Sequence, residues 1–491
     1  MDIIEIANII KESGGRLYLV GGAVRDKILG KKVQDEDYCI TGLSETEFVN
    51  LFPNAKIRGK SFAVFDMYKK EFALARKEKK VGLGHKEFEV ITGKEITIEE
   101  DLARRDITIN SIAEDVLTKE IIDPFDGRKD IENKTIRATS KAFSEDPLRV
   151  YRVARFAANL EFSVDKNTLK LMNTLKKELL NLSKERVFVE LKKALQTDKP
   201  SIFFNVLRDA NVLDVHFLEL YDLIGALQPV KYHPEGDAYN HTMLTLDNSA
   251  KQTKSLEIRF AALVHDLGKG LTPKEMYPHH YAHDKTGPLP VRELCKRIGV
   301  PNTWRKCGVT AAKEHMIAGI FFKMTPAKQV SLIERVEKSV LGIQGLQVVV
   351  NADSIRSEEH EKPKQFAPIA KKCIKEINGD YIMEKYGIKD GLEIKSKLHE
   401  ERVMWMKRNL EEKKTDVASE NGSITLFVLI ALLFFVIALM NVFFLTSSRV
   451  NSNLRDTKEL KEIYEKSDEE IETIYNNYIE EKNEEEREKD I

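Results

Sequence analysis

Two adjacent glycines near the start of the chain constrain its fold more than any other feature. They lie in LYLVGGAVRDKIL (17–29), between an apolar run and a stretch with helical spacing. This pattern predicts a strand over 17–20, a tight turn at Gly21 and Gly22, and a helix over 23–29. Glycines let a phosphate approach the backbone closely, and the start of a helix favours an anion. Arg25 in the first turn would face the same place, although an ordinary structural turn would leave the same pattern.

Two acids follow this turn. Asp35 and Asp37 lie in DEDYCI (35–40), which we expect to be a strand, so that both side chains project from one face. Neighbouring carboxylates repel each other unless a cation lies between them. A pair of Mg²⁺ ions would do this and would hold the two oxygens of an in-line phosphoryl displacement. A solvated acidic loop is the alternative, and Glu78 is a weaker candidate for a third acid. With the glycine turn upstream, the sequence favours nucleotidyl transfer.

The pattern of apolar residues divides most of the chain into four parts. Residues 1–140 alternate strand-like and helical runs, which predicts an α/β head with a mixed sheet. Residues 141–225 have helical spacing and predict a helical neck and body, and residues 226–375 predict an all-helical domain rich in histidine. Residues 376–420 predict a charged helical segment. The fold class is therefore α+β.

A long uncharged run comes next. Residues 424–445 are 22 residues without a charge, a length that suits one transmembrane helix. Beyond it, residues 446–491 form an acidic tail, in which residues 447–491 hold 8 Lys and Arg against 15 Asp and Glu. Basic residues on both sides of the run leave its orientation open. The four cysteines are scattered, which argues against a disulfide framework and indicates a reducing compartment.

Five blocks occur in order in the first two hundred residues. They resemble the class II tRNA nucleotidyltransferases, which comprise the CCA-adding enzymes and their bacterial poly(A) polymerase relatives. The blocks are LVGGAVRDKILGKKVQDED (19–37), DLARRDITINSIA (101–113), IIDPFDGRKDIENKTIR (121–137), EDPLRVYRVARFA (145–157) and ERVFVELKKAL (185–195). The resemblance implies template-independent addition of CCA to the 3′ end of tRNA from CTP and ATP. It also implies nucleotide-selecting and tRNA-binding helices in 141–225.

The resemblance also implies roles for single residues of the head. Asp35 and Asp37 are implied to hold the catalytic Mg²⁺ ions. Gly22 and Arg25 are implied to contact the incoming triphosphate, and Arg105 to make a further nucleotide contact.

Other residues are implied to surround the ribose and the base. Asp106 and Asn110 would shape the ribose and metal environment. Asp146 and Arg149 resemble the pair that selects the base through its hydrogen-bonding edge. Arg152 lies one helical turn beyond Arg149 and can face the same pocket. An acceptor beside rigid donors would let a protein select C and A without a nucleic acid template.

Most histidines lie in the second half of the chain. The dipeptide His265–Asp266 falls in an apolar helix, where its burial is costly without a partner. With His241 and Asp353 it gives two nitrogen and two oxygen ligands, a set suited to a divalent metal whose bound water attacks phosphate. The dipeptide alone would more often be a pair on a helix surface. Together the four residues resemble the HD phosphohydrolase domain.

The blocks around these residues resemble the HD domain fused to CCA-adding enzymes in the multifunctional CCA proteins of some bacteria. This implies phosphatase, 2′-nucleotidase and 2′,3′-cyclic phosphodiesterase activity for tRNA end repair, with His265 and Asp266 catalytic. Because Mg²⁺ prefers all-oxygen sites, we expect a divalent transition metal such as Ni²⁺. Further candidates for phosphate or second-metal binding, with a solvated loop as the alternative, are His279, His280 and His283. Lys269 is a candidate for neutralising a phosphate, with an ordinary lysine at the end of a helix turn as the alternative.

We therefore expect a multifunctional enzyme that acts on tRNA with CTP and ATP. Residues 424–445 would be a single-pass C-terminal anchor, with the catalytic body at the cytoplasmic face of the membrane and the acidic tail on the far side. Monomer and homodimer both stay open. A poly(A) polymerase, or a partial enzyme that adds only CC or only A, is the enzymatic alternative. A membrane-anchored RNA-binding scaffold is the alternative without catalysis.

Overall fold

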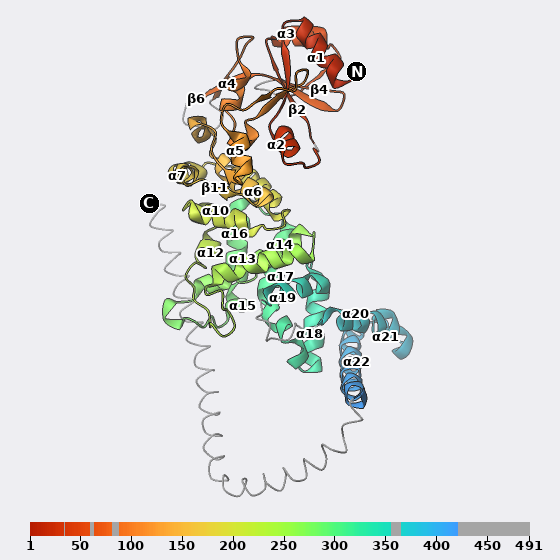
Figure 1. Ribbon diagram of the computed structural model, residues 1–491. Helices are drawn as coiled ribbons and strands as arrows, with labels where there is room; N and C mark the ends of the chain where they lie inside the picture. Colours follow the sequence, from red (N-terminus) through yellow and green to blue (C-terminus); the bar gives the residue numbers. More distant parts are fainter. Residues whose placement is uncertain (34, 59–62, 81–87, 355–364, 421–491) are drawn as a thin grey trace, which may run out of the picture. The chain divides into compact units, whose positions relative to one another are not determined.

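The computed structural model describes residues 1–33, 35–58, 63–80, 88–354 and 365–420 (Figure 1). The chain divides into two units, Met1–Trp405 and Met406–Ile491. The described part of the second is the end of helix α22 (Gly391–Glu420).

The head is built on a seven-stranded mixed sheet in the order β3-β4-β5-β2-β1-β8-β9. Strand β1 (Arg16–Val20) runs antiparallel to both β2 (Asp37–Thr41) and β8 (Ala113–Asp115). Strand β2 runs parallel to β5 (Lys70–Leu74) on its other side, which makes the sheet mixed, as predicted. The outer strands are β3 (Lys56–Arg58), β4 (Val64–Met67) and β9 (Ile121–Ile122), and a separate hairpin is formed by β6 (Arg76–Lys80) and β7 (Phe88–Thr92).

The glycine turn forms as predicted. Strand β1 ends at Val20, and helix α2 (Gly22–Ile28) begins two residues later. Gly21 between them has a φ of +73°, and a Cβ at this position would lie 2.8 Å from Arg105 Nη1. A side chain is therefore excluded here both by backbone conformation and by space.

The strand predicted over 35–40 is shorter than expected, and the prediction is wrong for its first two residues. Strand β2 begins at Asp37, which pairs with Val20, the last residue of β1. Because the chain turns away from the sheet at Gly21, β1 offers no partner to the residues before Asp37. Asp35 consequently lies in the loop that leads into β2.

Two helices complete the head on the other side of the sheet from α2 (Figure 1). Helix α1 (Ile3–Glu12) starts with a capping box between Asp2 and Glu5. Helix α3 (Glu45–Leu51) starts in the same way and buries Phe48 against the strands. The short helices that follow are α4 (Ile98–Ala103) and α5 (Gly127–Glu132).

The neck consists of helices with apolar residues three and four positions apart. Helix α6 (Arg149–Leu160) buries Val150, Val153, Ala154 and Ala157. It packs against α9 (Lys184–Leu195) and α10 (Ser201–Asp209). The remaining helices of this part are α7 (Lys166–Thr174), α8 (Lys176–Leu179), α11 (Leu213–His216) and α12 (Leu218–Tyr221).

The histidine-rich part is all-helical, as predicted. Helices α13 (Ala238–Gln252), α14 (Leu256–Val264), α17 (Asn302–Gly319) and α19 (Gly342–Asp353) pack against one another. The fully buried Arg259 on α14 donates hydrogen bonds to carbonyls of Leu195, Thr197, Ala250 and Thr253, which ties α14 to the end of α9. The remaining helices are α15 (His283–Thr286), α16 (Pro288–Ile298), α18 (Pro326–Glu337), α20 (Ala367–Glu376) and α21 (Gly379–Tyr386).

Over the described ranges, no helix is both long enough and apolar enough to cross a membrane. The predicted span at 424–445 and the acidic tail at 446–491 lie outside the described residues.

Candidate active sites

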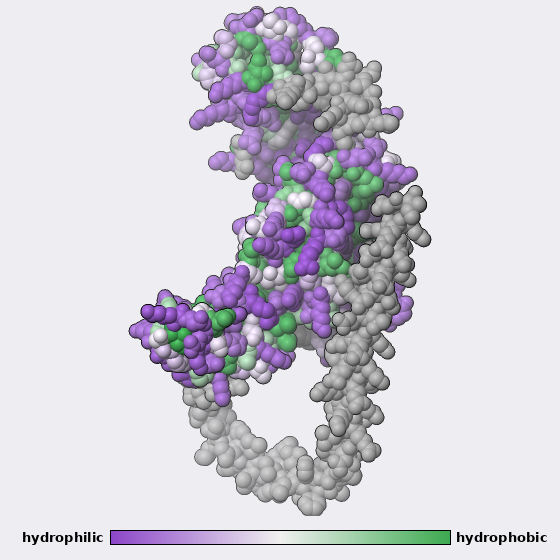
Figure 2. Space-filling model, turned by 180° about the vertical axis from the view of Figure 1, so that it is seen from behind, coloured by the Kyte–Doolittle hydropathy of each residue, from purple (hydrophilic) through white to green (hydrophobic). Residues whose placement is uncertain are grey.

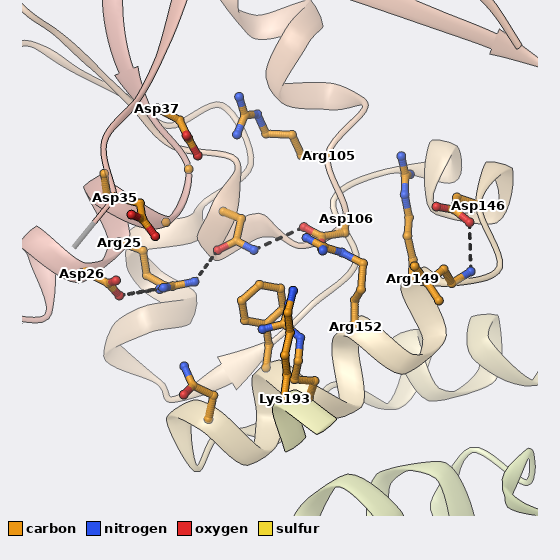
Figure 3. A pocket seen from close by; sticks show the side chains of 18 of the residues that line it. Arg25, Asp26, Asp35, Asp37, Arg105, Asp106, Asp146, Arg149, Arg152 and Lys193 are labelled. Atoms are coloured by element: carbon orange, nitrogen blue, oxygen red, sulfur yellow. Dashed lines mark hydrogen bonds and ion pairs between the residues drawn. The ribbon is translucent and has the colours of Figure 1, made fainter. Parts of the chain in front are cut away.

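A cavity of about 940 Å³ lies between the sheet of the head and helices α6 and α9 (Figure 3). The ten head and neck residues for which the resemblance implies a role all line it, although they come from segments more than a hundred residues apart. They are Gly22, Arg25, Asp35, Asp37, Arg105, Asp106, Asn110, Asp146, Arg149 and Arg152. We call this cavity the head pocket.

The two acids lie at one side of the head pocket. Asp35 sits in the loop before β2, and Asp37 is the first residue of β2, opposite Glu71 of β5. Burial raises the pKa of Asp37, the nearby carboxylates of Glu71 and Asp35 raise it further, and Arg105 opposes them. Such a site gains free energy from a cation, and carboxylate oxygens are ligands that Mg²⁺ prefers. The residues present therefore fit a magnesium site. The side chain of Glu78 is not among those that the structure describes.

Arg25 is held in place beside the glycine turn. Its side chain is 7 % exposed, and its Nε and Nη2 donate to Asp26 Oδ1 at 2.9 and 2.7 Å. Its Nη1 donates to Asn110 Oδ1 at 2.7 Å. A planar guanidinium fixed by two acceptors is pre-organised to meet an anion at the start of α2.

One amide then connects the head to the neck. Asn110 donates from Nδ2 to Asp106 Oδ1 at 3.3 Å, and Asp106 Oδ2 accepts from Arg152 Nε at 2.7 Å. Although burial alone would raise it, the pKa of Asp106 is held below its usual value by Arg152. The chain from Arg25 to Asn110, Asp106 and Arg152 needs a group in second place that accepts from a cation and donates to an anion. The amide of Asn110 does this with its Oδ1 and its Nδ2.

The residues expected to select the base both line the head pocket, but they have different partners. Asp146 accepts from Arg186 Nη2 at 2.9 Å and from the backbone N–H of Leu148 at 3.0 Å. Arg149 donates to the carbonyls of Ala142 at 2.5 Å and Arg104 at 2.7 Å. These bonds fix the orientation of both side chains.

Sequence reasoning missed a second set of pocket residues. Arg155 stands 4.0 Å from the ring centroid of Phe156, and its Nε donates to Glu190 at 2.5 Å. Arg25 and Arg152 each lie 5.4 Å from the same ring. Helix α9 adds Arg186 and Lys193 to the lining. The block 185–195 pointed to α9 as a whole, but its many charges gave no reason to choose two of them.

The histidine-rich helices bring together the four metal ligands expected from the sequence. His241 lies on α13, His265 and Asp266 at the end of α14, and Asp353 at the end of α19. His241 Nε2 is 2.7 Å from Asp353 Oδ1, and His265 Nε2 is 3.2 Å from Asp266 Oδ2. One ligand atom from each of the four lies within 4.8 Å of the others.

Their environment fits a divalent metal. His265 Nε2 and both carboxylate oxygens of Asp266 are buried without a hydrogen bond of normal geometry in the described part of the chain. Although burial alone would lower it, the pKa of His265 is raised to about 10 by Asp266 and Asp353. The cluster thus stabilises positive charge, which a metal ion bound by nitrogen and oxygen would supply.

A second group shares Asp266. His283 Nε2 and His315 Nε2 each lie 3.3 Å from Asp266 Oδ1, while Oδ2 of the same carboxylate faces the first group. His283 was among the weaker candidates from the sequence. His315 on α17 was missed, because a single histidine within a helix carries no local signal. His283 and His315 together with Asp266 would thus form a second group of ligands suited to a metal ion.

Nearby groups orient the histidine ligands. His241 Nδ1 is 2.6 Å from Glu235 Oε1, and Nδ1 of His265 is 2.7 Å from the Ala262 carbonyl. His283 and His315 likewise direct Nδ1 to backbone carbonyls. In each case Nε2 is left facing the cluster, as is usual for histidine ligands whose other nitrogen is held by a second group.

The other candidates of this region divide into two kinds. Lys269 is buried with its Nζ 2.6 Å from Asp266 Oδ2, at the edge of a cavity of about 220 Å³ that opens on the cluster. His280 hydrogen-bonds to Thr272 and to the Leu227 carbonyl, and His279 stacks on Tyr281. Lys269 therefore lies beside the candidate metal ligands, whereas His279 and His280 line the cavity and bond to other groups.

Three family models match the chain. Residues 17–137 match the poly A polymerase head domain, and residues 161–223 match a probable RNA and SrmB binding site of polymerase A. Residues 238–334 match the HD domain.

Curated relatives match over most of this sequence. The multifunctional CCA protein of Pseudoalteromonas atlantica is 41 % identical over 401 residues, which cover 79 % of this chain and 98 % of the relative. The proteins of the same name from Shewanella denitrificans and Psychromonas ingrahamii are 39 % and 45 % identical, covering 75 % and 62 % of this chain and 86 % and 75 % of the relatives.

Solved structures share the fold at lower identity. The apo form II of a CCA-adding enzyme is 21 % identical, with a TM-score of 0.58, and covers 85 % of this chain and 96 % of that one. A CCA-adding enzyme in complex with ATP is 20 % identical, with a TM-score of 0.56, covering 83 % and 90 %.

Proposed function

The chain belongs to the multifunctional CCA protein family, and we propose that its head pocket adds C, C and A to the 3′ end of tRNA from CTP and ATP. The observation that carries the proposal is the gathering of the acid pair, the glycine turn with Arg25, and the base-selecting candidates in one pocket. Each of these would serve a different part of a nucleoside triphosphate.

The acid pair and the turn serve the reacting end of the nucleotide. Asp35 and Asp37 would hold Mg²⁺, which supplies charge neutralisation between the attacking hydroxyl and the leaving pyrophosphate. Arg25, fixed by Asp26 and Asn110, would bind the phosphates beside Gly22, where no side chain blocks their approach to the backbone. Positioning and electrostatic stabilisation are the main contributions that phosphoryl transfer requires of a protein.

Residues of the neck would bind the base of the nucleotide. Asp146 supplies an acceptor and Arg149 a set of donors, both held by hydrogen bonds to the protein. Rigid groups of this kind can discriminate bases by their hydrogen-bonding edges, because a wrong base leaves a buried polar group unsatisfied. We assign Arg105, Asp106, Asn110 and Arg152 to the surroundings of the sugar and phosphates.

The HD cluster supports a second activity, phosphohydrolysis. His241, His265, Asp266 and Asp353 would hold a divalent transition metal such as Ni²⁺, which supplies Lewis-acid chemistry for phosphoester hydrolysis. Lys269 beside Asp266 would bind the phosphate of the substrate. We propose 2′,3′-cyclic phosphates, 2′-nucleotides and phosphomonoesters as the substrates.

The alternatives are weaker. A poly(A) polymerase or a partial nucleotidyltransferase shares the head pocket but gives no role to the HD cluster. A scaffold without catalysis would not need the buried ligands that surround Asp266. We propose that the head comprises residues 1–140, the neck residues 141–225 and the HD domain residues 226–375. We also propose that the catalytic body lies in the cytoplasm, where its tRNA and nucleotide substrates are.

Two matched variants test the proposal. Asp37→Asn removes a metal-holding carboxylate from the head pocket and should abolish CCA addition while phosphatase activity persists. His265→Ala should do the reverse. If either variant lost both activities while still folded, two separate sites could not be maintained.

A further inference from the structure

A third cavity, of about 400 Å³, lies on the helices of the HD domain and has no place in either reaction. Four cations from three helical segments converge on it: Arg292 on α16, Arg305 and Lys306 on α17, and Lys338 just after α18. We call it the basic hollow. Its remaining lining is neutral and consists of Val309, Thr310, Ser339 and Val340.

The charge of the basic hollow is not balanced by acids of the described chain. None of its four cations has an ion pair with a described carboxylate, and Arg305 donates only to Asn302 Oδ1 at 2.7 Å within that part of the protein. Residues 288–340 hold 10 Lys and Arg against 4 Asp and Glu. Two of those acids face other partners, since Glu314 pairs with Arg335 and Glu337 with Arg402.

The start of α17 adds to the positive potential. Arg305 and Lys306 are the fourth and fifth residues of this 18-residue helix, close to the end where free backbone N–H groups and the helix dipole are already positive. Cations at that end oppose helix stability. A bound anion would be favoured by the free N–H groups, by the helix dipole and by the two side-chain cations. The lining contains no aromatic ring to stack on a base. The chemistry therefore suits phosphate groups and not a nucleobase.

The basic hollow is connected to the head pocket through α9. Trp304, next to Arg305, packs against Phe188 of α9 with ring centroids 5.3 Å apart. The chain before α17 also approaches the start of α9, because a Cβ on Gly299 would lie 3.1 Å from Lys184 Cβ. Helix α9 carries Arg186 and Lys193 into the head pocket. Helix α9 thus contributes to the head pocket and also packs against the segment that starts α17, on which the hollow is built.

The hollow does not belong to the HD site. Arg305 and His315 are ten residues apart on α17, so they are separated by roughly 15 Å along the helix. The side chains at 305, 306, 309 and 310 line the hollow from one face of α17, and His315 points from another face into the metal cluster.

We propose that the basic hollow binds the phosphodiester backbone of the tRNA whose 3′ end occupies the head pocket. This inference rests on the proposed CCA addition. It assigns to the HD domain a role in substrate binding that does not depend on its metal cluster. RNA is favoured over a free nucleotide because the hollow offers charge and space without a group that would select a base.

The test compares two double variants of the full-length protein. Arg305→Gln with Lys306→Gln removes two cations of the hollow, and Lys328→Gln with Lys375→Gln removes two exposed cations elsewhere. Binding of a tRNA lacking CCA is measured against salt concentration. The hollow variant should bind about 5- to 20-fold more weakly at about 0.1 M salt, with a salt slope reduced by roughly 1.5, as expected for two lost phosphate contacts. The control should bind like the unmodified protein.

Enzyme kinetics with the same variants distinguish tRNA binding at the hollow from a role of its cations in nucleotide binding or phosphate hydrolysis. The KM for tRNA should rise in the hollow variant, while the KM for CTP and ATP and the hydrolysis of p-nitrophenyl phosphate stay unchanged. Lys306→Glu should weaken tRNA binding more than Lys306→Gln. Equal tRNA binding and salt slopes in both double variants would overturn the inference, and so would a rise in the KM for nucleotides alone. Failure of CCA addition in the unmodified protein would instead refute the proposed function, because binding is measured independently of it.

Discussion

At the scale of residues, Asn110 has the clearest single role. Its amide accepts from Arg25 and donates to Asp106. It therefore orients both Arg25, the candidate contact of the triphosphate, and Asp106, which bonds to Arg152 of the neck. Its neighbours carry full charges and are largely buried. Hydrogen bonds to charged groups are stronger than those between neutral groups.

We therefore expect Asn110→Ala to lower kcat/KM for CTP by about 10- to 100-fold, since it leaves two charged partners without their bond. Steady-state kinetics with a tRNA lacking CCA checks this. Asn159→Ala is the control, because Asn159 lines the same pocket and is exposed. Equal losses in the two variants would show that the hydrogen-bonded chain has no special role.

Glu235 acts through His241. Its carboxylate oxygen lies 2.6 Å from His241 Nδ1, which leaves Nε2 to the metal cluster. Glu235→Gln should lower the metal affinity of the HD site by about 10- to 100-fold, as for other groups that orient a histidine ligand. Calorimetric metal titration measures it, with Glu275→Gln as an exposed control and CCA addition unchanged in both. Unaltered metal binding in Glu235→Gln would remove this role.

A buried histidine makes stability depend on pH. His216 Nδ1 lies 2.6 Å from the hydroxyl of Tyr151, and burial lowers its pKa to about 4. Between about pH 6.5 and 4 the unfolded chain binds a proton that the native protein excludes, so stability falls as the pH falls through this range. The loss should be on the order of 1–3 kcal/mol. Urea unfolding at pH 7.5 and 5 should show a larger change for the unmodified protein than for His216→Leu, and equal changes would contradict the assignment.

At the scale of elements, the glycine turn explains both what the sequence predicts and what it does not. The strand, the turn and α2 follow from local pattern, because apolar alternation and paired glycines are local signals. The start of β2 could not be predicted in this way. It depends on where β1 ends and therefore on pairing between segments that only the folded chain brings together.

The turn itself can be tested with two alanines. Gly21 and Gly30 both have positive φ, but only at Gly21 would a Cβ meet the guanidinium of Arg105. Gly30→Ala should cost about 1 kcal/mol of stability with no change in activity. Gly21→Ala should cost roughly 1–3 kcal/mol and also raise the KM for CTP. Thermal unfolding and kinetics measure the two effects, and identical kinetics for both variants would argue against crowding at Arg105.

The same distinction, between local sequence signals and contacts formed only on folding, applies to the site residues. Those to which the resemblance assigns a role were found, because the family's residues have known roles. His315 and Arg186 were missed, although Arg186 lies in the block 185–195, since each reaches its site from a helix whose own sequence gives no reason to prefer it. Their partners, Asp266 and Asp146, come from other parts of the chain.

At the scale of the whole molecule, the two sites are built on separate sets of elements. The head pocket uses the sheet with α6 and α9, and the HD cluster uses α13, α14, α17 and α19. Packing between α9 and the start of α17 joins them, and α17 also lines the basic hollow. On the face shown in Figure 2, hydrophilic side chains cover most of the described surface and surround scattered apolar patches. Two sites on separate but packed sets of elements suit an enzyme that holds a large polyanionic substrate across more than one domain.

The most direct test of the account is the product made from a tRNA that lacks its 3′ CCA. The full-length protein is incubated with this tRNA, labelled CTP and ATP, and Mg²⁺, and the products are resolved at single-nucleotide length. We expect two additions of C followed by one of A, after which extension stops. A long tail of A alone, or no incorporation by a protein that still hydrolyses phosphoesters, would contradict it.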